Sequence, residues 1–480
     1  MLKKHLYFFI KKSSERQHRA YYRDYYRAEY AEFERCADKK SPARIRREMR
    51  CLQRYWKTYP FQYIRYRLYR KDCPLSMEQM KAYIPDYFAY FLFYPQSFNE
   101  RNVLCEDKRL FASLCRGYGI NHPRVLLSVS DGVLFDGGEN PCTAERVLAR
   151  IQASGVGRLF VKPTFGVGGK GIEVFDLREG RYLRTSDGRL LDAAYVEELK
   201  GDEWIVEEGL VPHPEMAAIY PHAICTFRIV TRNEKNSVSI LFSLLRVGQG
   251  AMQVDNASSG GLYMQVDAVT GKFAARAYAF DGRVHEKHPD TGFVFGDYTF
   301  PYWEELSRFV TLSAQKLNKI KYIGWDIAYT PDGPVVIEAN NGPGVSILQD
   351  SYGGLYDADN GVMLTGEISQ DMLGGYNKTV LQYANKGLAQ NMVSQGGGWY
   401  DMWNYVNDAT GYRVINTGLI PITEKFSINH VLTWGSADDI TDYTDKPRML
   451  SLVARGQYQF TDYVFRVIAQ NLYLHVLHGN

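Results

Sequence analysis

Two carboxylates and an amide are the residues of this sequence whose types and spacing most clearly suggest chemistry. In GWDIAYTPDGPVVIEANNGPG, Asp326 lies in one apolar run, Glu338 and Asn340 lie in the next, and a Pro-Asp-Gly turn separates the runs. Because side chains alternate along a strand, Glu338 and Asn340 share a face, and pairing of the two strands brings Asp326 to them. Three oxygen ligands without Cys or His suit a hard cation such as Mg²⁺. The alternative is a buried carboxylate that pairs with an arginine.

A glycine-rich loop is the second such feature. In RLFVKPTFGVGGKGIEVF, an apolar run that ends at Lys162 is followed by a loop and then by another apolar run. Glycines leave backbone N–H groups open to an anion. A loop that runs into a strand fits neither a Walker loop nor a dinucleotide-binding fingerprint. We therefore expect a phosphate flap within a hairpin, with an ordinary turn as the alternative; its glycines are Gly166, Gly168, Gly169 and Gly171.

Three further segments place polar side chains at or between strands. EWIVEEGL is a strand that ends in Glu207 and Glu208, and such a hinge can offer backbone N–H and C=O groups to an adenine edge. AICTFRIVT fixes Arg228 where its guanidinium can reach a phosphate, unless it is simply solvated. LLRVGQGAMQVDNASSGGLYMQVD supplies a polar cluster between strands, namely Arg246, Asp255, Asn256 and a Gly260-Gly261 turn.

The order of these segments resembles the ATP-grasp superfamily, and most closely its sugar-transfer-associated branch. The similarity covers about residues 60–350 and includes EDKRLF, VKPTFGVGGKGIEVF, CTFRIVT, VDNASSGG and GWDIAYTPDGPVVIEANNGPG. The resemblance implies an α+β fold in which two subdomains grip ATP between them.

The resemblance also implies a role for each candidate residue. Two lysines would hold the nucleotide phosphates, the glycines would form the flap, and a hinge would bind adenine and ribose. Other residues would bind Mg²⁺ or face the transferred phosphate and the acyl acceptor. The lysines are Lys108 and Lys162, the flap glycines are Gly166, Gly168, Gly169 and Gly171, and the hinge consists of Glu207, Glu208 and Leu210. The Mg²⁺ ligands would be Asp326, Glu338 and Asn340. The residues that face the transferred phosphate and the acyl acceptor would be Arg228, Arg246 and Asn256.

The implied activity is that of a ligase with ATP and Mg²⁺ as cofactors. A carboxylate would be activated as an acyl phosphate and then joined to an amine or similar nucleophile, while lysines, an arginine and the metal neutralise developing charge. The expected substrate is a small molecule or glycan precursor of cell-surface polysaccharide metabolism. The alternatives are an ATP-grasp kinase, a nucleotide-binding adaptor without turnover, and a sugar-specific outer-membrane porin fragment.

The porin alternative comes from the last part of the chain. From about residue 357 the pattern changes to period two, as in Phe426, Ile428, His430, Leu432 and Trp434. GGYNKTVLQYANKGLAQN, YRVINTGLIPI and ARGQYQFTDYVF resemble maltoporin-type carbohydrate porins. This predicts an antiparallel β segment like part of a porin barrel; a soluble domain of short strands is the alternative. Five or six expected strands are too few for a channel of roughly 16–18, so we expect a chimeric join near residue 356.

The first part of the chain is basic and aromatic. Residues 1–72 contain 21 Lys and Arg against 8 Asp and Glu, and Tyr22, Tyr26, Tyr30 and Phe33 follow helical spacing. This region would bind an anionic membrane surface or a polyanionic glycan carrier, or else pack its aromatic stripe on the next domain. Without a reader motif, no nucleic acid partner is expected.

The expected organisation is a helical region over 1–95, an ATP-grasp domain over 96–356 and a porin-like fragment over 357–480. Seven cysteines without a CxxC pair, and the lack of a signal peptide or an 18-residue apolar stretch, favour a cytoplasmic protein, peripheral to the inner membrane if the basic region binds lipid.

Overall fold

The computed structural model divides the chain into two compact units. The first comprises residues 1–77, 87–96 and 368–480, and the second comprises 78–86 and 97–367. All candidate site residues belong to the second unit. No helix among the described residues is long and apolar enough to cross a membrane. The structure describes residues 19, 21–56, 58–97, 101–165, 171–235, 237–356, 399–400, 404–408, 411–415 and 420–421.

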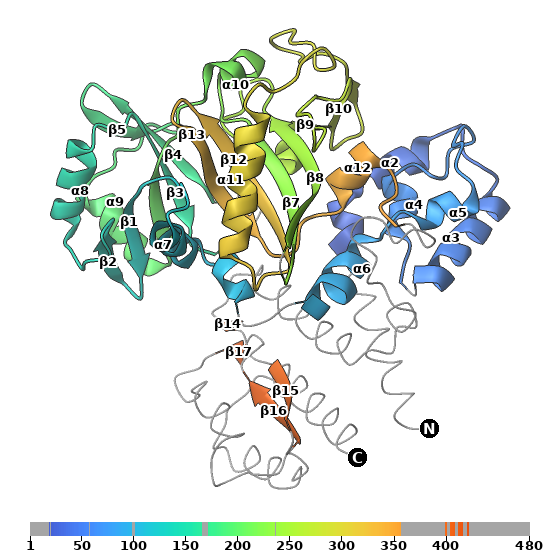
Figure 1. Cartoon of the computed structure of the whole chain (residues 1–480), viewed down its shortest axis with the longest axis horizontal. Helices are drawn as coiled ribbons and strands as arrows, with labels where there is room; N and C mark the ends of the chain where they lie inside the picture. The colour runs from blue at the N-terminus through green and yellow to red at the C-terminus, as the bar shows by residue number, and fades with distance from the viewer. Residues whose placement is uncertain are drawn as a thin grey trace. The chain divides into compact units, whose positions relative to one another are not determined.

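The second unit begins with a six-stranded antiparallel sheet in the order β2-β1-β6-β3-β4-β5 (Figure 1). Helix α8 buries Val147 and Ile151 against it, and α9 buries Tyr195. Asp107 caps α7 and Thr143 caps α8 through side-chain oxygens, which fixes where each helix begins. The elements are α7 (Lys108–Tyr118), β1 (Val125–Ser130), β2 (Val133–Asp136), α8 (Ala144–Ala153), β3 (Arg158–Pro163), β4 (Glu173–Arg178), β5 (Arg181–Arg184), α9 (Ala193–Glu198) and β6 (Trp204–Glu208).

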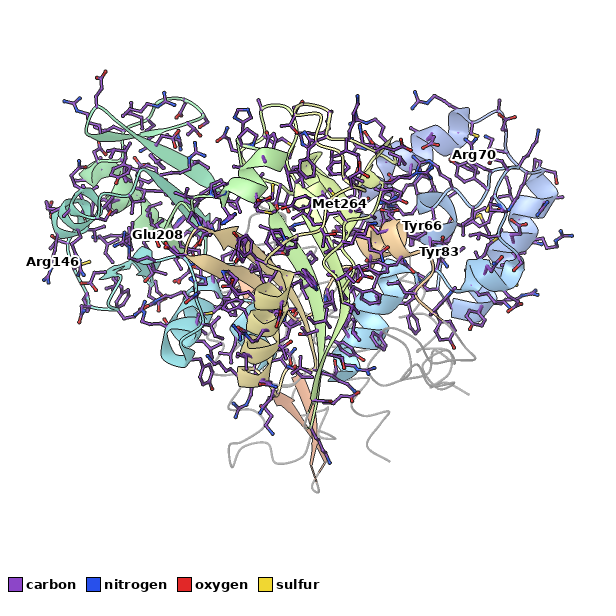
Figure 2. The ribbon with its side chains drawn as sticks, turned by 45° about the horizontal axis from the view of Figure 1, so that its top comes forward. Tyr66, Arg70, Tyr83, Arg146, Glu208 and Met264 are labelled. Atoms are coloured by element: carbon purple, nitrogen blue, oxygen red, sulfur yellow. The ribbon has the colours of Figure 1, made fainter. Side chains whose placement is uncertain are left out.

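A seven-stranded antiparallel sheet follows, in the order β11-β10-β9-β8-β7-β12-β13. Helix α11 covers it and buries Trp303 and Leu306 in a core that includes Phe227, Trp325 and Met264, the last labelled in Figure 2. The elements are α10 (Pro214–Ile219), β7 (Thr226–Glu234), β8 (Ser237–Val247), β9 (Leu262–Gln265), β10 (Ala277–Ala279), β11 (Val284–His285), α11 (Trp303–Lys316), β12 (Tyr322–Thr330) and β13 (Gly333–Asn340).

Packing of the second unit continues to residue 356. After helix α12 (Ser346–Tyr352), Leu355 is fully buried, and the N–H of Tyr356 donates to the carbonyl of Ala82. The Gln349 amide makes hydrogen bonds of 2.6 and 2.9 Å with the backbone N–H and C=O of Ile84. The residues just before the expected join therefore complete this unit.

This packing predicts different outcomes for two truncations. A chain that ends at residue 356 keeps α12 and should unfold at the temperature of the second unit in the full chain. A chain that ends at residue 344 loses the buried Leu348 and Leu355 and should be destabilised strongly, since removing a buried leucine side chain typically costs about 2–5 kcal/mol. Thermal unfolding followed by circular dichroism measures both. If the longer truncation cannot fold while the full chain does, residues beyond 356 contribute to this unit.

The first unit contains the basic helical region. The hydroxyl of Ser41 accepts a hydrogen bond from the N–H of Arg44, which stabilises the start of helix α3. Tyr22 and Tyr26 are buried, and the Tyr22 ring contacts Phe61 with centroids 5.0 Å apart. The first two tyrosines of the predicted aromatic stripe thus pack within this unit. Its helices are α2 (Arg27–Arg35), α3 (Pro42–Trp56) and α4 (Phe61–Arg65).

Short helices α5 (Met77–Lys81) and α6 (Asp86–Phe88) lie where the two units alternate along the chain. Of the porin-like segment, the structure describes two antiparallel pairs: β14 (Trp399–Tyr400) with β17 (Ile420–Pro421), and β15 (Asn404–Asp408) with β16 (Gly411–Ile415). The expected strand around Phe426–Trp434 lies outside the described residues.

Candidate functional site

The register of the seven-stranded sheet places three charged candidates in one row. Asp326 on β12 lies opposite Glu338 on β13 and opposite Arg228 on β7. Directly opposite residues of antiparallel strands share a face, so the predicted approach of the carboxylates is confirmed. A register shift next to Asp326 leaves Ile337 without a partner on β12, which makes it the extra residue of a bulge. Asn340 lies opposite Gly324, two residues further along β13 from Glu338 and on the same face of the sheet.

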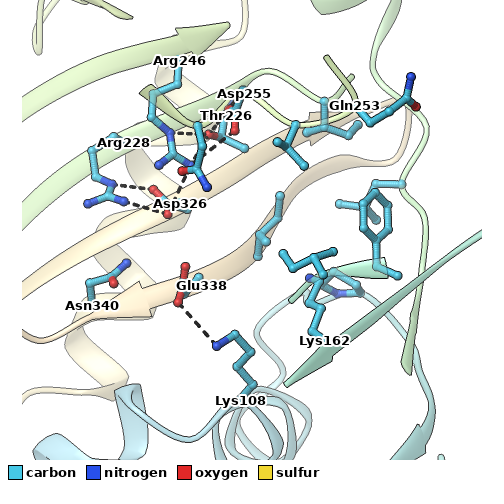
Figure 3. A pocket seen from close by; sticks show the side chains of 18 of the residues that line it. Lys108, Lys162, Thr226, Arg228, Arg246, Gln253, Asp255, Asp326, Glu338 and Asn340 are labelled. Carbon is cyan, nitrogen blue, oxygen red and sulfur yellow. Dashed lines mark hydrogen bonds and ion pairs between the residues drawn. The ribbon is translucent and has the colours of Figure 1, made fainter. Parts of the chain in front are cut away.

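One pocket of about 220 Å³ gathers most of the predicted site residues (Figure 3). The phosphate lysines, the three predicted metal ligands, the two arginines and Asn256 all line it, together with the last two hinge residues. In sequence order these ten are Lys108, Lys162, Glu208, Leu210, Arg228, Arg246, Asn256, Asp326, Glu338 and Asn340.

Asp326 is held by two arginines. The Arg228 guanidinium donates to both of its carboxylate oxygens, at 2.5 and 2.9 Å, and Arg246 Nη2 lies 3.3 Å from Oδ2. Burial alone would raise the pKa of Asp326, but the two arginines outweigh it and hold that pKa below its ordinary value. The interpretation of a buried carboxylate paired with an arginine therefore describes Asp326, and any cation bound there would share it with Arg228.

Arg246 is itself fixed by a second polar cluster. Its Nε and Nη2 donate to the hydroxyl of Thr226 at 3.0 and 2.8 Å, and Nη2 lies 3.6 Å from Asp255. Thr226 in turn donates both its backbone N–H and its hydroxyl to Asp255. Burial raises the pKa of Asp255, against the opposite effect of Arg246. The guanidinium group of Arg246 therefore has little freedom to turn away from the pocket.

The two lysines face the pocket from other elements. Lys162 at the end of β3 donates to Glu207 at 2.6 Å. Lys108 at the start of α7 lies 4.0 Å from Glu338, and Figure 3 shows this ion pair. Burial would raise the pKa of Glu207, but Lys162 and His122 lower it overall. Burial lowers the pKa of Lys108, partly offset by Glu338.

Glu207 is one predicted binding residue that does not line the pocket. Its side chain is buried against Lys162, so its position indicates that it orients that lysine and does not contact a ribose. In the hinge, the N–H of Glu208 donates to the backbone carbonyl of Arg124, and the N–H of Gly209 donates to the backbone carbonyl of Arg158. The N–H of Leu210 has no partner among the described residues, so Leu210 is the hinge position that can offer a backbone donor.

The predicted flap is described only at its end. Gly166, Gly168 and Gly169 lie outside the described residues. Gly171 has a φ of +75°, and a Cβ there would lie 3.1 Å from Pro163, so a larger residue would be strained. Gly171 does not line the pocket.

Sequence reasoning missed the apolar wall of the pocket, apart from Leu210. Phe160 precedes Lys162 by two residues on the same strand, so period-two alternation could have placed it on the same face. Asp255 also lines the pocket, as a member of the polar cluster that the sequence indicates next to Asn256. Apart from Pro163 at the end of β3, the other missed apolar residues come from loops and from the bulge, which leave no such periodicity. The apolar lining residues are Pro123, Phe160, Pro163, Ile172, Leu210, Ile224, Val254 and Ile337.

Among the described residues, no group of three or more His, Cys, Asp and Glu side chains could hold a metal ion by itself. Asp326, Glu338 and Asn340 offer two carboxylates and an amide, and Glu338 accepts no hydrogen bond from the described residues. Such a set fits a hard cation that takes its other ligands from phosphate oxygens and water.

The environment of Glu338 predicts a pH dependence of stability. Burial and the neighbouring Asp326 raise its pKa, although Lys108 acts in the opposite direction. Because the folded pKa lies above the unfolded one, the folded state binds this proton more tightly, and that stabilisation is lost as pH rises through the raised pKa. Glu338→Gln should therefore gain in melting temperature relative to the parent as pH rises from about 4. The matched control is Glu286→Gln, at an exposed position. If melting temperature depends on pH in the same way for the parent and both variants, the prediction is wrong.

Comparison with protein families gives two matches. The family described as "Sugar-transfer associated ATP-grasp" matches residues 92–356, and the family described as "LamB porin" matches residues 260–469. Maltoporin 1 of Klebsiella pneumoniae subsp. pneumoniae is 95% identical over 122 residues, which are 25% of this chain and 29% of that protein. Maltoporin 2 of Yersinia pestis (strain Pestoides F) is 77% identical over 122 residues, with the same coverage. The chain thus spans less than a third of these relatives.

Comparison with solved structures gives ligases at low similarity. The VanG D-Ala:D-Ser ligase from Enterococcus faecalis is 16% identical, with a TM-score of 0.31 over 58% of this chain and 62% of that chain. The D-alanine–D-alanine ligase from Bacillus anthracis is 13% identical, with a TM-score of 0.29 over 61% and 70%. The ATP-grasp ligase PsnB, solved with Mg and ADP, is 16% identical, with a TM-score of 0.27 over 51% and 52%. The assignment of the fold therefore rests on the family match.

Proposed function

This chain belongs to the sugar-transfer associated ATP-grasp family, and from that membership we propose that its second unit binds Mg·ATP and activates a carboxylate for ligation. The observation that carries the proposal is the pocket itself. It brings lysines from α7 and β3, arginines from β7 and β8, and two carboxylates and an amide from β12 and β13 within reach of one ligand.

The charge of the pocket supports a ligand that combines a polyanion with a cation. Its lining includes four basic and four acidic side chains. A bare triphosphate would meet as much repulsion as attraction, whereas a triphosphate with a divalent cation offers charges of both signs. The lysines would then contact phosphate oxygens, while Glu338 and Asn340, with Asp326, would hold the metal. When bound, the metal supplies charge neutralisation at the reacting phosphate.

The apolar wall supports a nucleotide base at one end of the pocket. Phe160, Ile172 and Leu210 line it, and Leu210 retains a backbone N–H for an adenine edge. Phe160 shares one face of β3 with the phosphate-binding Lys162, so the base and the phosphates would lie along the same strand.

Arg228 and Arg246 would face the transferred phosphate and the carboxylate substrate. Both guanidinium groups are fixed before any substrate binds, by Asp326 and by Thr226. Preorganised donors of this kind stabilise charge that develops in the transition state without reorientation. A glycan precursor that carries a carboxylate is the substrate class that agrees with the family description.

The reaction is tested by product analysis. The full chain is incubated with Mg·ATP and panels of sugar acids and amino acids, and ADP, phosphate and the organic product are measured. A ligase releases ADP and phosphate only when a carboxylate and an amine are both present. A phosphorylated hydroxyl product would make the protein a kinase, and nucleotide binding without ADP formation would make it an adaptor.

For residues 357–480 we propose a foreign origin, by a chimeric join near residue 356. The match to 29% of a maltoporin at 95% identity supports this origin. Sugar transport is not proposed for this chain, because the segment spans so little of such a protein.

A further inference from the structure

Helix α3 carries four arginines on the face opposite its buried residues. Ile45, Leu52 and Trp56 mark the buried face. At 3.6 residues per turn, the outer face comprises the exposed arginines and the smaller side chains between them. With Ala43 and Cys51, the arginines line an open surface hollow of about 530 Å³. This arginine stripe consists of Arg46, Arg47, Arg50 and Arg54.

No acidic side chain of the described residues forms an ion pair with the arginine stripe. Glu48 is the only acid of α3, and it is buried, where it accepts hydrogen bonds from Lys40, Arg44 and Tyr63 at 2.9, 2.8 and 2.6 Å. Within the described part of the chain, none of the four arginines forms an ion pair. Several other basic side chains of this unit are paired, as Arg67 is with Glu32 and Arg70 is with Asp72. Like charges at i and i+4 destabilise a helix, and an anionic partner would relieve that repulsion.

The geometry of the stripe selects the kind of partner. Arg46 and Arg54 are two turns apart, about 12 Å along the axis, and side chains on the outer face of one helix diverge. Diverging arginines cannot converge on one small anion, but they can each bind a separate phosphate. The stripe includes no amide to read base edges and no aromatic ring to stack on bases, which disfavours a nucleic acid.

We propose that the arginine stripe of α3 docks the protein on an anionic phospholipid surface. Laterally mobile headgroups can supply one phosphate to each arginine, and a negative membrane surface attracts clustered basic residues. This proposal goes beyond ligase activity, and it concerns residues that the pocket does not use. Failure of one proposal would leave the other intact.

The test is flotation of the full chain with vesicles of phosphatidylcholine alone or with about 30% phosphatidylglycerol. We expect binding to the anionic vesicles only, and its loss as salt rises from about 0.05 M to 0.5 M. Replacing all four arginines of the stripe by glutamine should weaken partition at least about a hundredfold. Replacement by lysine keeps the charge and should retain most of the binding, which separates lost charge from a damaged helix.

A matched control removes the same charge elsewhere. Arg116, Arg146, Arg181 and Arg308 are exposed residues of the second unit, and none forms an ion pair with a described residue. Their replacement by glutamine should leave vesicle binding unchanged. Equal loss in both quadruple variants, equal binding by parent and stripe variant, or no binding to anionic vesicles by the parent would each overturn the proposal. Stripe-dependent binding to RNA but not to vesicles would also overturn it.

Discussion

Asp326→Asn and Glu338→Gln should each lower ADP formation by at least about a hundredfold while leaving part of the nucleotide affinity. Loss of one preorganised group that stabilises transition-state charge typically costs about 10²–10³ in rate. Asp326 also fixes the two arginines, through contacts of 2.5, 2.9 and 3.3 Å, so its replacement disturbs more than a metal ligand. Glu338 has no such contact with an arginine of the described residues, and its replacement should act mainly on the metal.

A magnesium titration distinguishes the two roles. Glu338→Gln should require a higher Mg²⁺ concentration for half-maximal ADP formation, whereas Asp326→Asn should also raise the KM of the carboxylate substrate. Asp332→Asn, in the turn between β12 and β13, is a control outside the pocket and should behave as the parent does. ADP formation that is unchanged in both pocket variants would reduce these carboxylates to a structural role.

Lys162→Ala should abolish ATP binding and also destabilise the protein. The lysine is the partner of Glu207, whose side chain is 2% exposed, and removal of one member of a buried ion pair typically costs about 3–5 kcal/mol. A loss of ATP binding in this variant alone would therefore be ambiguous. The double variant Lys162→Ala with Glu207→Gln removes both charges and should recover most of the lost melting temperature.

The double variant separates phosphate binding from folding. If Lys162 holds phosphate, the recovered melting temperature will not be accompanied by recovered ATP binding. The matched control is Glu207→Gln alone, which keeps the lysine and should retain ATP binding. If the double variant binds ATP as the parent does, Lys162 serves only to compensate Glu207. We also expect Lys162 to contribute more to ATP binding than Lys170 of the glycine-rich loop, which lies outside the described residues.

The strand pair that carries the carboxylates could be predicted from local pattern. Alternation and the turn at Gly333 fix which residues of β12 and β13 face one another, and Asp326 does lie opposite Glu338. The extra residue at Ile337 could not be predicted, because a bulge has no signal in apolar spacing. The family resemblance supplied Lys108, whose sequence context alone indicates only the start of a helix.

The partners of the buried carboxylates depend on sheet order, which a single sequence does not encode. Arg228 is 98 residues from Asp326 in the chain and becomes its neighbour because β7 lies beside β12. The place of Glu207 at a strand end predicts a hinge residue. Its burial against Lys162 arises because β6 lies beside β3, which again is a property of the whole sheet.

The most direct test of the account is whether ATP and Mg²⁺ together stabilise the full chain. Thermal unfolding is measured with ATP and Mg²⁺, with ATP and a chelator, and with Mg²⁺ alone. We expect a shift that grows with ligand concentration by mass action, equivalent to about 2.7 kcal/mol at a hundredfold excess over Kd, and only when both are present. The double variant at Lys162 and Glu207 should show no shift. A parent protein whose unfolding is unaffected by saturating Mg·ATP would contradict the account.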